Sequence, residues 1–383
     1  MYFVLVYIAV YFSFAAVTPY LSLLVRGLEY SPKAVGILLG VFEGAGMGGP
    51  FLFGCFADRT GRYKPGLLIS AALVVVSAIP LILFRSPLLS GLFLAVMAVG
   101  FRSTIPLLDA VTTVNQGKSG NYGKIRTVGS VSFIAMALFL QWTPALRPDN
   151  SRNIGVVIAL CSALILIFVT ILPPRYARIE KPVPAPAAPK LPRKKTGLRP
   201  SLLIPGIIII ALSRLAMTPV YTFFPLYLTE SLHWNVVSLM FALAAAAEVP
   251  CMYISQRLIR RFGALRLLAA SAAAIGVRLA VYAFCPFKPA LLLAQLLHSL
   301  CYGVFHPAAI ALVSGCLPPE RRALGMSLYL SLGTGFPAFI GNIIGGFIVD
   351  HAGYQALFIS FMIFPAMVMG LYFFVAVKRQ SVI

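Results

Sequence analysis

Long apolar stretches recur along nearly the whole chain, and they restrict the fold more than any other feature of the sequence. A helix needs about 20 consecutive apolar residues to cross a bilayer. Twelve stretches of this kind can be found, at residues 3–25, 33–56, 66–84, 88–113, 123–143, 154–172, 202–228, 234–255, 266–285, 289–315, 323–348 and 354–377. Charged residues make up only 11% of the chain, against about 25% in soluble domains. The sequence therefore predicts an all-α membrane protein with twelve transmembrane helices.

The basic residues are distributed unevenly between the two sets of loops. The chain carries 31 Lys and Arg and a formal net charge of +21. With the N-terminus inside, most of the basic loop residues fall in inner loops, and the outer loops hold only Arg26, Lys33, Arg85, Arg147, Arg152 and Lys288. This bias follows the positive-inside rule. It predicts a multi-pass protein of the cell (inner) membrane with both termini in the cytoplasm, and it explains the positive charge without a nucleic-acid partner.

One long polar stretch divides the spans into two groups of six. Residues 173–200 are rich in proline and basic side chains, which prevents a helix and favours a flexible cytoplasmic linker. The two groups also echo each other, since Gly61 and Gly263 stand at matching places after the second span of each group. We therefore expect two pseudo-symmetric six-helix bundles, residues 1–172 and 201–383, with the substrate bound between them near the middle of the membrane.

Neither a cofactor nor a metal site is indicated. The six cysteines are scattered through apolar segments without CxxC spacing, which is typical of small buried hydrophobic residues. Serine, histidine and acidic residues show no catalytic spacing, and no soluble domain is present in the sequence. These observations argue against an enzyme.

The segment GCFADRTGRYK, which follows the second span, resembles the loop 2–3 signature of the major facilitator superfamily. That signature has the form G-x-x-x-D-R-x-G-R followed by a basic residue; here Tyr63 stands at the last position and Lys64 follows it. The resemblance implies the twelve-helix fold of that superfamily. Because Asp58 ends the second span, its carboxylate can meet arginines and a helix N-terminus of the other bundle and hold the cytoplasmic side shut. The residues assigned to this conformational gate are Gly54, Asp58, Arg59, Gly61, Arg62 and Arg126.

Further stretches resemble the branch of the superfamily that contains phenylpropionate permeases, nucleoside–proton symporters and lactose-permease-like carriers. They are PLLDAV followed by YGKIRTVGS, YTFFPLYL, AEVPCMYISQRLIRRFG and LLHSLCYGVFHPAAIALV. The similarity covers nearly the whole chain apart from the linker. It implies a carrier of small solutes but does not fix the substrate.

Away from the ends of the predicted spans, six Arg, Asp or Glu residues lie inside them, three of each sign: Arg102, Arg214, Arg278, Glu43, Asp109 and Glu248. Such residues are rare within a bilayer and face the interior of a helix bundle, so each is a candidate for function. The equal numbers indicate mutual pairing.

The charges of the first half allow both a structural and a functional interpretation. Asp109 and Arg126 match positions that recur in the resembling branch, and they either form a structural pair between the fourth and fifth spans or contact the substrate. Glu43 departs from the branch pattern. It is either a local partner for Arg102 or a substrate-binding group.

The second half carries a sharper set of candidates. Glu248, Arg278, His298 and His306 fall where the branch places a glutamate, an arginine and two histidines. Histidine changes charge near neutral pH, and a carboxylate in apolar surroundings can hold a proton. Together these groups could take a proton from one side of the membrane and release it to the other, with Arg278 pairing directly with Glu248 while it is ionised. A packing role for the histidines is the alternative.

Aromatic and polar residues on neighbouring spans complete the predicted substrate site. Tyr7 and Tyr11 share a helix face, as do Tyr221 and Phe224 in the corresponding span of the second half. Ordinary packing is the alternative for each of them. The predicted substrate-binding residues are Tyr7, Tyr11, Glu43, Arg102, Asp109, Arg214, Tyr221, Phe224, Tyr302 and Asn342.

These features predict a proton-coupled symporter of a small organic solute that works by alternating access, as a monomer in contact with membrane lipid. An uncoupled facilitator or an exporter of the same fold is the alternative. A receptor or scaffold that transports nothing is a more remote one, because it would not need a balanced set of charges within the membrane. The arginines favour an anionic solute, whereas the balancing acids allow a neutral sugar or nucleoside.

Overall fold

The computed structural model describes residues 1–116, 122–143, 146, 150–173, 176, 200–318 and 321–380. Within these ranges, eleven segments are long and apolar enough to cross a membrane. The last of them, Leu324–Ala376, runs for 53 residues, more than twice what one crossing needs. Gly353 breaks it with a φ of 79°, a conformation that glycine adopts without steric cost. The segment therefore crosses twice, and the twelve predicted spans are confirmed.

The first half of the chain forms six spans from seven helices. Met47 separates α2 from α3 within the second span. The helices are α1 (Tyr2–Arg26), α2 (Pro32–Gly46), α3 (Gly48–Thr60), α4 (Tyr63–Leu83), α5 (Pro87–Gln116), α6 (Tyr122–Trp142) and α7 (Ser151–Ile171).

The second half begins with a short 3-10 turn, η2 (Pro200–Leu202), and its spans are less regular. Wide π-helical turns interrupt the first, fourth and fifth spans of this half. In chain order the elements are α8 (Leu203–Ala216), η3 (Pro219–Phe223), α9 (Phe224–Leu226), η4 (Tyr227–Ser231), α10 (Val237–Phe262), α11 (Ala264–Phe284), α12 (Lys288–Leu296), η5 (Ser299–Val304), α13 (Phe305–Cys316), α14 (Arg322–Leu328), η7 (Tyr329–Gly335), α15 (Phe336–Phe361) and α16 (Ile363–Gln380).

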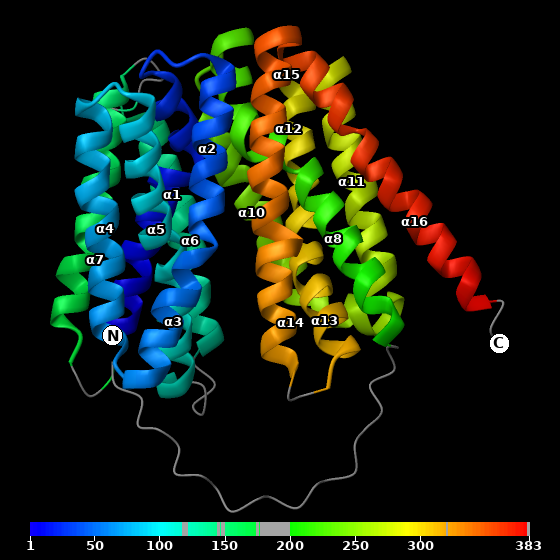
Figure 1. Cartoon of the computed structure of the whole chain (residues 1–383), viewed down its shortest axis with the longest axis horizontal. Helices are drawn as coiled ribbons and strands as arrows, with labels where there is room; N and C mark the ends of the chain where they lie inside the picture. The colour runs from blue at the N-terminus through cyan, green and yellow to red at the C-terminus, as the bar shows by residue number, and fades with distance from the viewer. Residues whose placement is uncertain are drawn as a thin grey trace, which may run out of the picture.

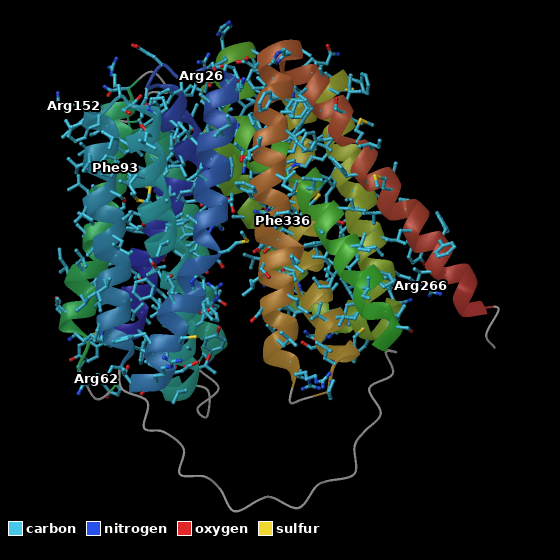
Figure 2. All side chains as sticks on the ribbon, in the orientation of Figure 1. Arg26, Arg62, Phe93, Arg152, Arg266 and Phe336 are labelled. Carbon is cyan, nitrogen blue, oxygen red and sulfur yellow. The ribbon has the colours of Figure 1, made fainter. Side chains whose placement is uncertain are left out.

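The two halves stand beside each other, and the start of α1 and the end of α16 lie toward the same end of the molecule (Figure 1). We call this end the linker end, since α7 finishes and α8 begins there. Arg62 lies at this end, whereas Arg26 and Arg152 lie at the opposite one (Figure 2). Apart from 173, 176 and 200, the predicted linker lies outside the described residues, so the division at 173–200 stays a prediction.

The two halves touch closely at the end opposite the linker, which we call the closed end. Helices α2 and α15 meet backbone to backbone there, and a Cβ atom added at Gly36 would lie 2.6 Å from Gly346 Cα. Arg26 Nε donates to Glu230 Oε1 over 2.6 Å, and the Lys33 amide donates to Asp350 over 3.3 Å. In the described part of the chain, the hydrogen bonds and ion pairs between the halves lie toward this end.

Candidate functional site

A tyrosine and two charges from three helices meet in the first half. Tyr7 on α1 donates a hydrogen bond to Asp109 Oδ1 on α5, and Arg126 Nε on α6 lies 3.6 Å from the same oxygen. The Arg126 guanidinium also lies over the Tyr11 ring, 5.1 Å from its centroid. The structure thus places Asp109 and Arg126 as a pair, and their contact with the substrate stays a prediction. One nitrogen of Arg126, Nη1, is buried without a hydrogen-bond partner, so this group keeps an unused donor.

A second ion pair of the first half lies between α2 and α5. Arg102 Nη2 donates to Glu43 Oε1. The Arg102 guanidinium also approaches the rings of Phe42 and Phe101, 5.8 and 6.0 Å from their centroids. Of the two interpretations of Glu43, the structure shows the local partner of Arg102. Both side chains remain partly exposed, which leaves the pair accessible.

Arg278 on α11 is 2% exposed and is held entirely by neutral groups. Its Nε donates to the Tyr282 hydroxyl over 2.7 Å, its Nη1 lies 3.0 Å from His298 Nδ1, and its Nη2 donates to Gln295. Gln295 Nε2 in turn donates to the same hydroxyl over 2.9 Å. All three guanidinium nitrogens are therefore satisfied inside the second half, without a carboxylate among these partners.

His298 stands between Arg278 and Glu248. An arginine only donates hydrogen bonds, so His298 Nδ1 accepts from Arg278 and its Nε2 carries the proton. This Nε2 lies 3.7 Å from Glu248 Oε2. The predicted direct ion pair of Arg278 with Glu248 is therefore corrected, because the imidazole ring fills the space between them. Figure 1 shows α10, α11 and α12, which supply or adjoin these groups, grouped in the same half.

Three rings of the tenth span form a stack along one face. His298 and Tyr302 have centroids 5.8 Å apart and planes 4° apart, and Tyr302 and His306 follow at 5.5 Å and 7°. The π turn η5 between the histidines needs more residues per turn than an α-helix, which keeps the four-residue spacing near one face. At the His306 end of the stack, His306 Nδ1 lies 2.6 Å from the hydroxyl of Tyr329, which is the first residue of η7.

Arg214, near the end of α8, lies over the Tyr221 ring at 4.8 Å from its centroid. Tyr221 also packs edge-on against His298, with centroids 5.9 Å apart. Neither ion pairs nor hydrogen bonds to Arg214 are found among the described residues. This guanidinium thus belongs to the histidine site but has no carboxylate of its own there.

The sites of the two halves face each other at mid-depth. The charge of Arg126 interacts electrostatically with Glu248 and Tyr302, and the charge of Arg102 reaches Tyr302. Glu248 lies about 16 Å along α10 from the closed end, at 1.5 Å per residue, and its side chain is 18% exposed. A carboxylate in such a place needs an accessible polar surrounding, because burial of an unpaired charge is costly.

Two predicted substrate-binding residues have structural places instead. Phe224 is 1% exposed and stacks on Tyr282, with centroids 4.3 Å apart, in the core of the second half. Asn342 is also buried. Its side-chain Nδ2 donates to the backbone oxygen of Ala338, and the backbone carbonyl oxygen of Asn342 faces Gly36 of α2. The structure therefore corrects both assignments to packing positions.

The predicted gate makes only local contacts in this conformation. Asp58 accepts a hydrogen bond of 2.8 Å from Tyr63, and Arg59 and Arg62 are exposed. Gly61 ends α3 with a φ of 68°, and Gly263 has a φ of 80° at the matching place in the second half. The two glycines thus share a backbone requirement that explains the echo between the halves.

Three members of the site, Gln295, Tyr282 and Tyr329, were not predicted from the sequence. Tyr282 stands four residues after Arg278, a spacing that places both on one helix face and that could have suggested the contact. Tyr329 joins through a π turn, which no periodicity in the sequence announces. No group of three or more metal-ligating side chains occurs in the described ranges.

Comparisons with known proteins extend this geometry. The profile of the MFS_1 like family matches residues 2–360. The chain is 26% identical to the maltose permease of Geobacillus stearothermophilus over 94% of this chain and 90% of that protein. It is 25% identical to the "Probable 3-phenylpropionic acid transporter" of Escherichia coli (strain K12), over 94% of each chain.

Among solved structures, the nucleoside transporter NupG (D323A mutant) superimposes with a TM-score of 0.77 at 16% identity, over 97% of this chain and 99% of that one. A POT family transporter in complex with 5-aminolevulinic acid gives the same TM-score at 11% identity, over 99% and 96%. At such identities these structures show the shared fold alone. Because the family profile covers nearly the whole chain and the fold agrees with it, the protein belongs to the MFS_1 like family and is a multi-pass membrane transporter of the major facilitator type.

Proposed function

We propose that the protein is a proton-coupled symporter of a small organic solute, with Glu248 as the group that binds the proton. The observation that carries this proposal is the position of Glu248, beside His298 within one half and within electrostatic reach of Arg126 from the other. A carboxylate between two movable halves changes its surroundings whenever the halves move. Its preference for the protonated form then depends on conformation, which is the requirement for coupling.

The unused donor of Arg126 supports the same cycle. Arg126 Nη1 has no partner here, and Glu248 is the carboxylate across the boundary whose charge it senses. If the halves approach at the linker end, an ionised Glu248 gains this partner, whereas a protonated one gains less. Proton release and closure at that end are thereby linked, because closing around an unpaired charge is costly.

The substrate would bind between the halves, near Arg102, Asp109, Tyr11, Arg214 and Tyr302. Contacts between the halves are concentrated at the closed end, and the charged side chains at mid-depth remain partly exposed, which supports access from the linker end. The positive-inside rule supports a cytoplasmic position for that end. We therefore infer an inward-open state of a monomeric carrier in the bacterial inner membrane, whose partners are protons, one solute and surrounding lipid.

The alternative is a facilitator or exporter of the same fold that does not use the proton gradient. It would keep Glu248 only to compensate the charges of Arg126 and, when protonated, of His298. That alternative predicts that neutralising Glu248 damages downhill and uphill transport equally, because the structural charge balance is lost in both. Coupling predicts that the two are separated.

The deciding experiment uses purified Glu248→Gln in proteoliposomes, with a substrate first identified by screening radiolabelled carboxylates, nucleosides and sugars. The glutamine imitates the protonated carboxyl group, so we expect counterflow exchange to be retained and accumulation driven by a pH gradient to be lost. Glu29→Gln is a matched control, because Glu29 forms an exposed ion pair with Arg85. Normal uphill uptake by Glu248→Gln would remove Glu248 from the coupling mechanism.

A further inference from the structure

We propose that Arg214 binds the anionic group of the substrate and that the substrate is an organic monoanion, a carboxylate with a planar apolar body. This inference rests on the proposed function only in taking the mid-depth site as the place where the solute binds. Its observations are the charge balance of that site and the surroundings of Arg214.

The charges at mid-depth can be assigned one by one. Arg102 is paired with Glu43 and Arg126 with Asp109, each within the first half. Glu248 has His298 beside it and Arg126 across the boundary. The two guanidinium groups that remain are those of Arg278 and Arg214.

Arg278 is unavailable to a solute. It is almost fully buried, and its three nitrogens are engaged by Tyr282, His298 and Gln295. A ligand would have to displace two side chains and an imidazole ring to reach it. Arg278 is therefore a positioning residue, which fixes the orientation of His298.

Arg214 differs from Arg278 in its burial and in its partners. It is only half-buried, and it packs over the face of the Tyr221 ring, which takes up none of its five N–H donors. It lies about 16 Å along α8 from the linker end, at 1.5 Å per residue, and its charge acts on His298 and Tyr302. No acidic residue within the described ranges forms an ion pair with it. Four arginines thus stand against three acids at the site, and Arg214 is the accessible guanidinium among the described residues that no carboxylate pairs.

A planar fork of donors in a water-poor place suits a carboxylate, which can accept two parallel hydrogen bonds from it. A neutral solute would leave this guanidinium desolvated and without a counter-charge as the halves close. The surrounding side chains are rings: Tyr221 beneath Arg214, and the stack of His298, Tyr302 and His306 beside it. Ring edges and faces favour a planar apolar body attached to the anionic group.

The test measures binding to the purified full-length protein, by thermal stabilisation and isothermal titration. The probes are pairs that differ in charge alone: benzoate with benzamide, cinnamate with cinnamamide, and hexanoate with hexanamide, together with uridine and maltose as neutral polar solutes. We expect a carboxylate to bind best and its amide to bind at least tenfold more weakly. Arg214→Gln should abolish this preference, whereas Arg257→Gln, at an exposed position near the end of α10, should preserve it.

If Arg214→Gln is poorly folded, Arg214→Lys serves instead, since it keeps the charge but loses the fork and should weaken carboxylate binding without inverting the preference. Tightest binding by a neutral probe, equal binding of acid and amide, an unchanged preference in folded Arg214→Gln, or an unchanged carboxylate affinity in Arg214→Lys would each overturn the proposal. Uphill uptake of the best ligand is assayed separately. Accumulation of a neutral ligand by a pH gradient would overturn the anion site while leaving proton symport intact. A carboxylate that binds through Arg214 but is never accumulated would support the anion site and contradict proton symport.

Discussion

The contact between α2 and α15 provides a direct test of how the closed end is held. In Gly36→Ala the added methyl group would lie 2.5 Å from the carbonyl oxygen of Asn342 and 2.6 Å from Gly346 Cα. Both are backbone atoms, so no side-chain rotation can relieve the overlap. The helices must move apart, and the close approach that defines the closed end is lost.

The size of the effect follows from the cost of overpacking. Inserting a methyl group into a packed contact costs about 1–3 kcal/mol. If that cost falls on the closed-end conformation alone, its population decreases by about 5- to 150-fold relative to the alternative. Alanine also favours a helix over glycine by about 1 kcal/mol, but this gain applies equally in both conformations.

Distances between spin labels report the change. One label replaces Leu88 and the other Phe287, which are 83% and 58% exposed at the starts of α5 and α12. We expect the distance between them to increase in Gly36→Ala. Gly370→Ala in α16 is the matched control, since a Cβ atom there meets nothing within 4 Å. Identical distance distributions in Gly36→Ala, the control and the unmodified chain would refute the reasoning.

Two further predictions concern the linker end and the buried arginine. Asp58→Asn should leave the present conformation nearly unchanged, because Asp58 bonds only Tyr63 here, but should weaken closure of the linker end. Spin labels at Cys55 and Arg257 should then show a larger open fraction during turnover, with unchanged substrate preference. An open fraction equal to that of the unmodified protein would contradict the gate. Tyr282→Phe removes the oxygen that accepts hydrogen bonds from both Arg278 and Gln295, so the free energy of unfolding should decrease by about 1–3 kcal/mol. Thermal unfolding measures this decrease, with Tyr253→Phe at an exposed position as the control. Equal stability of the two variants would show that the hydrogen bonds around Arg278 do not stabilise the fold.

The course of the chain through the membrane could be read from the sequence because one requirement governs it. Backbone groups in lipid must be bonded within the segment, so an apolar stretch of sufficient length has hardly any alternative to a helix. The break at Gly353 was also predictable, as the end of one apolar stretch and the start of the next. The π turns were not, since they depend on packing within the second half and not on the periodicity of its residues.

Pairing of charges was predictable where the partners lie close in one half, and Asp109 with Arg126 is the example. It was less predictable for Arg278, because equal numbers of acids and bases suggested a carboxylate partner. In the structure this arginine bonds a hydroxyl, an amide and an imidazole nitrogen. These groups are neutral, so counting charges in the sequence cannot reveal them. Phe224 and Asn342 show the same limit, since a face shared along a helix does not reveal what that face touches.

The π turns give the two halves different mechanical properties. In the described part of the chain they occur at η3, η4, η5 and η7, all in the second half, whereas the helices of the first half lack them. A π turn holds one residue more than an α turn and often lies at a functional site. Moving that extra residue along the helix would rotate and advance the residues beyond it. The second half therefore has places for such a shift around His298, Tyr302 and Tyr329, which the described helices of the first half lack. Duplication supplied two copies of one architecture, and only one of them has the compliance to change shape while it moves.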